Sequence, residues 1–241
     1  MTGPAPLRVW ITRAEPGASR TAARLRDMGL KPIIAPLLAV EPLTPVLPDL
    51  AIFTALAFTS PNGVAAYASL TPRRDHAVFA VGDATAQAAS AAGFPDVRSA
   101  QGDLTALARL IAASLSDAAL LIPQAETPAG DMTAALTQAG ARRIVAHPLP
   151  IYRTNPTAQP APAAFDAVLI HSLRAARLLA DRHAADRHAA ALHDTMIACI
   201  SPAAAAPLAA LGLHPLIAPS PNEAALLAIF NPTLGKRGAS V

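Results

Sequence analysis

Three short segments of this chain place hydroxyl groups and small residues where an apolar run gives way to a helical pattern. They are Thr12-Arg13, Thr59-Ser60-Pro61-Asn62 and Val81-Gly82-Asp83-Ala84-Thr85. In a parallel sheet the carboxyl ends of the strands line the ligand crevice, and the helix N-termini there present free backbone amides to anions. These turns therefore indicate a binding site for a ligand rich in carboxylates.

Several of these side chains also have a purely structural interpretation. Ser60 and Thr85 stand near the start of a helical stretch, where a hydroxyl commonly caps the first turn. Arg13 can meet a carboxylate of a ligand, or it can form a surface ion pair with Glu15. The sequence leaves both interpretations open for each residue.

The turns occur twice, because the chain contains an internal repeat. The segment VWITRAEPGAS near the N-terminus returns in mid-chain as LLIPQAETPAG. In the same way the later turns with Ser172 and Ser201 correspond to those with Ser60 and Gly82. A period this long is that of a whole domain. We therefore predict two similar α/β lobes with a ligand cleft between them, and Ser172 and Ser201 are further candidate contacts.

Short apolar runs alternate with amphipathic stretches, which is typical of parallel sheets covered by helices. We predict two flavodoxin-like lobes, each with such a sheet. Helices are expected to begin at Ser60, at Asp103, and at Ser220 with Glu223 in the first turn. Left-handed helix ends are expected at Gly29, Gly93, Gly140 and Gly212. The expected strands are 7–12, 31–36, 56–59, 77–81, 119–122, 144–146, 167–170, 196–200 and 215–218.

Two proline-dense stretches, about 37–48 and 147–162, interrupt this alternation. Proline removes a backbone donor and stiffens extended chain, so we interpret both stretches as connectors between lobes. Two connectors imply that the chain leaves the first lobe, builds the second and returns. Lobe one would comprise residues 1–38 and 155–241, and lobe two would comprise residues 42–149.

Composition narrows the classes of function. The net charge of the 241 residues is +3 with scattered arginines, and aromatic residues make up 4%. This favours an anionic small molecule, whereas nucleic acid would require a basic stripe with interleaved aromatics. No uninterrupted apolar run reaches the eighteen or so residues of a membrane span, so we expect a cytoplasmic protein that binds neither membrane nor nucleic acid.

Neither a metal nor a cofactor is expected. The phosphate-binding patterns GxxxxGK[ST] and GxGxxG do not occur. The single cysteine, Cys199, lies in the apolar run MIACI and is interpreted as a buried structural thiol. His183, His188 and His193 are five residues apart, which on a helix turns successive side chains by about 140° relative to one another, so they cannot share one metal. We interpret them as a solvated extension of a helix.

Together these segments resemble the uroporphyrinogen-III synthase family. The resemblance covers nearly the whole chain in order, and it implies an enzyme without metal or cofactor. Such an enzyme takes hydroxymethylbilane, inverts its ring D and closes the macrocycle with loss of water, in the biosynthesis of haem and other tetrapyrroles. The segments that carry the resemblance are ITRAEP, AFTSPNGV, VGDATAQAASAAGF, PLPIYRT in the second connector, CISPAAAAPLAALGL and APSPNEAALLAIF.

The resemblance also implies roles for residues. Tyr152 matches the tyrosine of the family's connector motif and would donate a hydrogen bond or a proton as the hydroxyl departs; otherwise it is an aromatic packed between lobes. We expect a monomer that receives hydroxymethylbilane from hydroxymethylbilane synthase. The expected substrate contacts are Arg13, Thr59, Ser60, Asn62, Gly82, Thr85, Ser172 and Ser201.

The second half of the chain departs from the family pattern. His171-Ser172 is followed by Leu173 in place of a proline, and Ala204 replaces an expected hydroxyl. Lobe two should therefore carry most of the specific side-chain contacts. Two alternatives stay open: a non-catalytic binding or regulatory protein of the same fold, and a two-lobed sugar or amino-acid binding protein.

Overall fold

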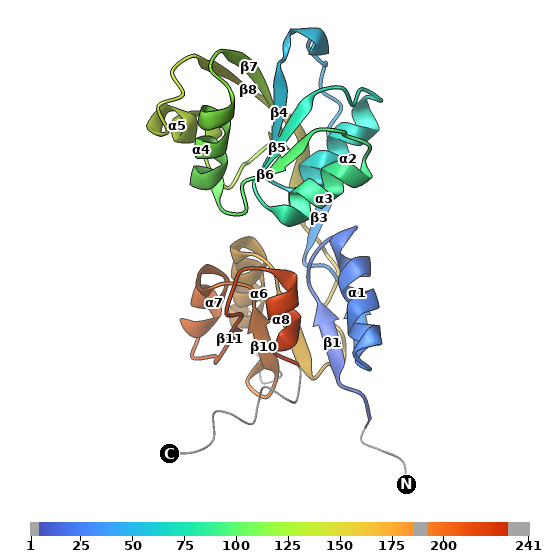
Figure 1. The fold of residues 1–241 in the computed structure, drawn as a ribbon. Helices are drawn as coiled ribbons and strands as arrows, with labels where there is room; N and C mark the ends of the chain where they lie inside the picture. The colour runs from blue at the N-terminus through green and yellow to red at the C-terminus, as the bar shows by residue number, and fades with distance from the viewer. Residues whose placement is uncertain (1–4, 186–191, 231–241) are drawn as a thin grey trace. The chain divides into compact units, whose positions relative to one another are not determined.

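The chain folds into two compact units, which are described separately (Figure 1). The computed structural model describes residues 5–185 and 192–230. Unit 1 comprises Met1–Ala39 and Asn155–Val241, and unit 2 comprises Val40–Thr154. The chain thus passes between the units twice, once in each direction.

Unit 1 is a parallel sheet with helices on both faces. The sheet order is β11-β10-β9-β1-β2, so β9 is the central strand. Helices α6 and α7 pack on one face, and α1 and α8 pack on the other. The elements are β1 (Arg8–Ile11), α1 (Gly17–Asp27), β2 (Lys31–Ile34), β9 (Ala167–Ile170), α6 (Leu173–Ala185), β10 (Met196–Cys199), α7 (Pro202–Ala209), β11 (Leu216–Ile217) and α8 (Glu223–Ala228).

Alternation of side chains along the strands explains this layering. Trp10 and Val168 belong to the cluster under α6 and α7, whereas Val9 and Leu169 belong to the cluster under α1 and α8. Successive residues of a strand point to opposite faces, and both faces here are covered by helices. The strands are therefore apolar throughout, which is why their sequences read as continuous apolar runs.

An ion pair fixes the first strand of unit 1 to the residue before its central strand. The Arg8 guanidinium donates to both Asp166 oxygens, at 3.0 and 2.7 Å, and the Arg8 backbone N–H adds a third bond at 2.8 Å. The Arg8 hydrogen bonds lower the pKa of Asp166 to about 2. The contact joins two residues that are 158 positions apart in the chain.

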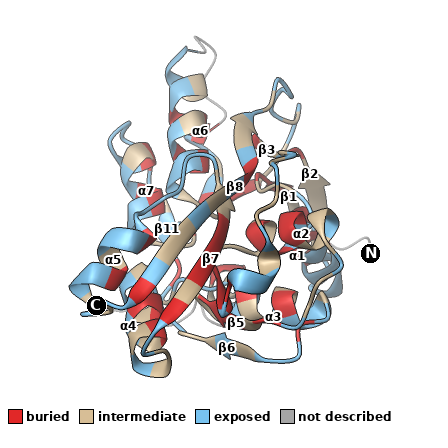
Figure 2. Cartoon of the chain, turned by 90° about the horizontal axis from the view of Figure 1, so that it is seen from above, coloured by how far each residue is buried: buried red, intermediate tan, exposed pale blue. Residues whose placement is uncertain are grey.

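Unit 2 has the order β3-β8-β7-β4-β5-β6, and its strands from β4 to β8 are mutually parallel. Helices α2 and α3 cover one face, and α4 and α5 cover the other. Figure 2 shows buried residues along β7 and also on helices such as α2. The elements are β3 (Leu38–Pro42), the 3-10 turn η1 (Leu50–Ile52), β4 (Ala55–Phe58), α2 (Pro61–Leu70), β5 (Ala77–Ala80), α3 (Asp83–Ala91), β6 (Val97–Ser99), α4 (Leu104–Ser114), β7 (Ala118–Ala125), α5 (Met132–Gln138) and β8 (Ile144–Pro156).

The two sheets share one spatial order. Unit 1 reads β11-β10-β9-β1-β2, and unit 2 reads β6-β5-β4-β7-β8 with β3 added at the edge. In unit 1 this is the flavodoxin-like order 2-1-3-4-5, in which the order of the strands along the sheet reverses between β1 and β9. In unit 2 the chain enters the same arrangement at β4, so the strands after β3 read 3-2-1-4-5. The corresponding turns are those of the sequence repeat: Ser172 and Ser60 follow β9 and β4, and Ser201 and Gly82 follow β10 and β5.

Both proline-dense stretches contain strands, and the chain passes between the units within them, at residues 39–40 and 154–155. Residues 38–42 form β3, and β8 continues through Pro148 and Pro150 as far as Pro156. Proline holds φ near an extended value, so it fits a strand wherever its missing N–H is not needed. The edge strand β6 was not expected either, because Val97 is its only apolar residue.

Helix ends follow the expectations with one correction. Ser60 and Asp103 accept a backbone N–H as N-caps of α2 and α4. Helix α8 begins at Glu223, but its cap is Asn222, which accepts from Ala225 N at 2.9 Å, so the prediction of Ser220 was wrong. Ser220 instead accepts a bond from the Asn222 side chain. The four predicted left-handed glycines, Gly29, Gly93, Gly140 and Gly212, all have positive φ.

The described helices include none that is both long enough and apolar enough to cross a membrane.

Candidate functional site

Most of the predicted contacts of unit 2 lie at the carboxyl edge of its sheet. Thr59 and Ser60 directly follow β4, and Gly82 follows the neighbouring strand β5. The backbone N–H of Val81 donates to Phe58 O at 3.0 Å, which holds the two strand ends together. The fold therefore brings these three residues to one edge.

Ser60 caps helix α2, as its structural interpretation required. Its Oγ accepts the backbone N–H of Asn62 at 3.1 Å, and Pro61 occupies the first helical position. This hydroxyl keeps its own proton, because capping uses only a lone pair. Capping and ligand contact are therefore compatible for Ser60.

Helix α3 begins without a side-chain cap. Gly82 is its N-cap in an extended conformation, so no side chain covers the first amides of the helix. A Cβ at Gly82 would meet its nearest atom, Gly102 O, only at 4.0 Å. The capping interpretation of Thr85 is wrong, because Thr85 lies inside α3, with only 2% of its surface exposed.

Tyr152 is a buried phenol on β8, with 6% of its surface exposed. Its ring packs in the cluster that contains Phe58 and Val64, and its Cε1 would lie 3.8 Å from a Cβ at Gly63. Burial raises the pKa of Tyr152, and a hydrogen bond with Ser60 opposes that shift. The structure thus brings together two of the predicted site residues, Tyr152 and Ser60.

Arg13 follows β1 in unit 1 and forms an ion pair, but not with the predicted partner. Its Nη1 donates to Glu223 at 3.1 Å, whereas Glu15 accepts from Ser19. Burial lowers the pKa of Arg13, and Glu223 opposes that shift. A Cβ at Gly17 would lie 2.3 Å from Arg13 Nε, so the guanidinium rests on the first turn of α1.

The two serines of unit 1 also act as caps. Ser172 Oγ accepts from Ala175 N at 3.1 Å, and Ser201 Oγ accepts from Ala204 N at 3.3 Å. Ala204 itself is fully buried in the cluster under α7. A hydroxyl at position 204 would therefore sit among apolar side chains.

His171 is the polar side chain of unit 1 that sequence reasoning undervalued. It follows the central strand β9, and both of its ring nitrogens are buried without a hydrogen-bond partner in the described part of the chain. By contrast, the buried His76 contacts Leu50 O at 2.9 Å through Nε2. Burial, and then the charge of Arg13, lower the pKa of His171 to about 3. The imidazole is therefore neutral at physiological pH and contributes no positive charge for a carboxylate.

Cys199 and the histidines of the segment after α6 were not assigned to the candidate site. Cys199 is buried, which confirms the prediction of a structural thiol, and burial raises its pKa to about 12. His183 lies in the last turn of α6, with its ring centroid 5.7 Å from that of His193, and His188 lies outside the described residues. The described residues contain no group of three or more ligands that could hold a metal ion.

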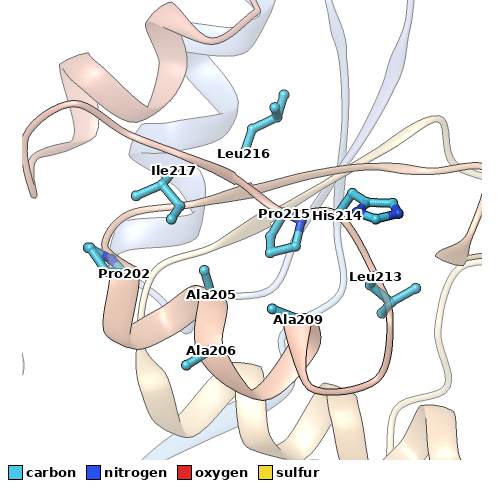
Figure 3. Close-up of a pocket in the computed structure, with 9 residues that line it drawn as sticks. All are labelled: Pro202, Ala205, Ala206, Ala209, Leu213, His214, Pro215, Leu216 and Ile217. Carbon is cyan, nitrogen blue, oxygen red and sulfur yellow. The ribbon is translucent and has the colours of Figure 1, made fainter.

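Two surface hollows lie apart from the predicted contacts. The first, of about 490 Å³, lies in unit 1 between α7 and the segment 213–217, and His214 is its only polar lining residue (Figure 3). The second, of about 430 Å³, follows β7 in unit 2 and is lined by Gln124, Pro148 and residues 128–133. Neither hollow is lined by a predicted site residue, so neither supports the predicted ligand contacts.

The fold defines an α/β protein of two units, each with a parallel sheet covered by helices. The model of the family HEM4, uroporphyrinogen-III synthase HemD, matches residues 19–228. The chain belongs to the uroporphyrinogen-III synthase family. Members of this family cyclise hydroxymethylbilane, so the chain is an enzyme of tetrapyrrole and haem biosynthesis. The alternative of a non-catalytic binding protein is not favoured.

Solved structures share this fold. The uroporphyrinogen-III synthetase from Helicobacter pylori 26695 is 18% identical, with a TM-score of 0.64 over 96% of this chain and 100% of that one. A mutant uroporphyrinogen III synthase from the extremely thermophilic bacterium Thermus thermophilus is 18% identical, with a TM-score of 0.54 over 95% of this chain and 99% of that one. No curated protein resembles the chain closely enough to count as a match.

The neutral, buried state of His171 predicts a specific pH dependence of stability. The pKa is lowered on folding, so below its ordinary value of 6.5 the unfolded chain takes up a proton that the folded chain does not. Stability is therefore lost as pH falls toward about 3. H171N should reduce the fall in unfolding free energy between about pH 7.5 and about pH 5 by about 2 kcal/mol.

Chemical denaturation at the two pH values measures this difference. H214N, at an exposed position of the same unit, is the matched control and should leave the fall unchanged. An H171N protein with the wild-type fall would show that His171 is accessible and free to titrate.

Proposed function

We propose that this chain performs the reaction of its family with Tyr152 as the proton donor, converting hydroxymethylbilane to uroporphyrinogen III with inversion of ring D and loss of water. The observation that supports this assignment is the buried phenol held beside Ser60 at the edge of the unit 2 sheet. A positioned phenol is a competent general acid.

The first task is to hold a flexible octacarboxylate in a folded shape. Positioning of this kind lowers the barrier by fixing the reacting ends before chemistry begins. Each sheet offers candidate contacts for the substrate carboxylates at its carboxyl edge: hydroxyls, backbone amides and, in unit 1, one guanidinium. Unit 2 contributes Thr59, Ser60, Asn62, Gly82 and Thr85, and unit 1 contributes Arg13, Ser172 and Ser201.

The second task is to remove the hydroxyl. Tyr152 gives its proton to the hydroxymethyl oxygen while the carbon–oxygen bond breaks, and water leaves with both electrons of that bond. The substrate becomes a delocalised azafulvenium cation and Tyr152 a phenolate. Ring closure passes through a spiro intermediate, and the proton finally released from the attacked pyrrole returns to the phenolate. Atoms and charges therefore balance over the cycle.

Burial of Tyr152 serves this step in two ways. Because burial raises the pKa of the phenol, Tyr152 holds its proton at neutral pH until the leaving oxygen accepts it. The apolar cluster around the ring also limits access of water to the cation, which water would otherwise capture. Hydroxymethylbilane also closes without the enzyme, to the other isomer. The enzymatic reaction must be faster than this spontaneous closure.

The units contribute unequally in this proposal. Arg13 is already paired with Glu223 and His171 is neutral, so these two candidate residues of unit 1 offer little free positive charge. Its contacts are chiefly main-chain amides and the capping serines. Unit 2 carries the phenol and the uncapped start of α3.

The proposal includes a cytoplasmic monomer that receives its substrate from hydroxymethylbilane synthase. These parts rest on the chemistry of the family alone. Hydroxymethylbilane closes spontaneously to the wrong isomer, and a direct handover would shorten its time in solution.

The test is to supply hydroxymethylbilane to the purified chain, oxidise the products and separate isomers I and III. Isomer III should form faster than spontaneous closure. Isomer I alone, at the spontaneous rate, would identify a non-catalytic binding protein instead.

Replacement of Tyr152 tests its role as proton donor. Y152F should lower turnover by about tenfold or more, because the phenylalanine keeps the packing but cannot donate a proton. Initial rates and thermal unfolding are measured together, so that loss of fold is recognised. Y67F changes the only other tyrosine of the chain and should keep the wild-type rate. Equal rates for Y152F and Y67F would show that Tyr152 contributes packing and not proton transfer.

A test of Arg13 must separate its proposed contact with the substrate from its ion pair with Glu223. R13A removes both the pair with Glu223 and the proposed contact to a carboxylate, whereas E223Q removes only the pair. R13A should raise KM about tenfold relative to E223Q with little change in kcat, the effect of one charge-assisted hydrogen bond of about 1.5 kcal/mol. The same KM for both variants would assign Arg13 to the structure of unit 1.

A further inference from the structure

A largely buried polar network in unit 1 joins three elements at the carboxyl edge of the sheet. Glu223, the first residue of α8, accepts from Arg13 Nη1 at 3.1 Å and from Thr21 Oγ1 at 2.5 Å. Arg13 follows β1, and Thr21 lies on α1. Each oxygen of the Glu223 carboxylate therefore has its own donor, the guanidinium at Oε2 and the hydroxyl at Oε1.

The proton of Thr21 goes to Glu223. Thr21 Oγ1 also lies 3.0 Å from Gly17 O, but a hydroxyl has a single proton to donate. The carboxylate is the closer acceptor and is charged, and charge-assisted hydrogen bonds are the shorter and stronger ones. Thr21 is fully buried, so solvent does not compete for the proton. The hydroxyl thus fixes the orientation of the carboxylate.

Gly17 makes room for the guanidinium of Arg13. A Cβ at residue 17 would lie 2.3 Å from Arg13 Nε and 2.6 Å from Nη2, so a side chain there would displace the guanidinium. Glu223 accepts from Nη1, and the described residues provide no acceptor for Nε and Nη2. The Arg13 side chain is 25% exposed. Although paired, Arg13 therefore keeps N–H donors for a carboxylate of a ligand.

The corresponding corner of unit 2 is apolar. Met132 corresponds to Thr21 in the sequence repeat, and Leu104 begins α4 as Glu223 begins α8. Helix α4 follows the edge strand β6, just as α8 follows the edge strand β11. Met132 is buried, and Leu104 packs against the same cluster. Apolar side chains in place of a buried ion pair are often neutral or stabilising for a fold, so packing alone does not account for the network in unit 1.

We propose that Thr21 and Glu223 are positioning residues for Arg13: the Thr21 hydroxyl orients the Glu223 carboxylate, which holds the guanidinium over Gly17 at the carboxyl edge of the unit 1 sheet, ready for a carboxylate of the substrate. The inference rests on the proposed contact between Arg13 and the substrate. Sequence reasoning placed neither Thr21 nor Glu223 in the site.

The first experiment measures how fast Arg13 reacts with phenylglyoxal, a reagent for guanidinium groups, in the full chain. Peptide mass spectrometry reports the labelling of each arginine, and Arg8, paired with Asp166 in the same unit, is the internal reference. T21V keeps the shape of the side chain but removes the hydroxyl, and it should raise the labelling of Arg13 several-fold relative to Arg8. T21S retains a hydroxyl and should restore the wild-type labelling.

The second experiment measures initial rates with hydroxymethylbilane. T21V should raise KM about threefold with little change in kcat, because the proposed contact is to a carboxylate and not to the reacting carbon. In an R13A background the same substitution should leave KM unchanged, because Thr21 acts through Arg13. A merely structural role of Thr21 would affect both backgrounds alike.

A matched control and a second variant accompany T21V. Thr137 Oγ1 on α5 bonds the carbonyl four residues earlier, Thr133 O at 3.0 Å, as Thr21 bonds Gly17 O. T137V should leave the labelling of Arg13 and KM unchanged. G17A displaces the guanidinium while alanine suits the helical backbone, so it should raise both values as T21V does, even if T21V fails to fold. Thermal unfolding shows whether each variant is folded.

Two results would overturn the inference. One is wild-type labelling of Arg13 in folded T21V or G17A, and the other is an equal rise in KM on T21V substitution with and without Arg13. The labelling does not depend on turnover, so it separates this inference from the proposed function. Increased labelling in T21V, together with a wild-type KM for R13A, would show that Arg13 is held in place but does not contact the substrate.

Discussion

The candidate site depends on one constraint of parallel sheets: all strands run in the same direction, so all their carboxyl ends meet at one edge. In unit 1 this edge collects the turns after β1, β9 and β10, and in unit 2 it collects those after β4 and β5. Helices on both faces bury the strands and keep them in register. The polar groups that remain at this edge are the backbone amides and capping hydroxyls of the helix N-termini. For this reason several capping serines are also candidate ligand contacts.

Sequence patterns predicted the elements well and their boundaries less well. Each strand expected from an apolar run is present among the described residues, because burial on both faces requires such runs. The sequence pattern did not predict the strands β3 and β6, and the reasons differ. In β3 and the second half of β8, proline suggested a connector, although extended proline is compatible with a strand. In β6, a single apolar residue at an edge leaves no pattern to detect.

The turns of the candidate site could be predicted from the sequence, but the side-chain pairings within them could not. The repeat indicated which turns correspond, and the sheet orders give the same correspondence. Arg13 pairs with Glu223, 210 residues away, and no local spacing can indicate such a partner. The same holds for Tyr152 and Ser60, which belong to different elements. For His171 the residue type was visible in the sequence, but its neutrality follows from burial, which only the packed structure gives.

The ion pair between Arg8 and Asp166 has a consequence for how the chain folds during synthesis. Unit 2 is one continuous segment, whereas the sheet of unit 1 lacks its central strand until β9 emerges. Domains generally fold as units as soon as their residues are available. While unit 2 folds, the edge of β1 that pairs with β9 is therefore open, and the sheet faces that α6, α7 and α8 cover are exposed. Nascent chains should be most exposed to aggregation and to chaperones in that interval, and closure of the Arg8–Asp166 contact marks its end.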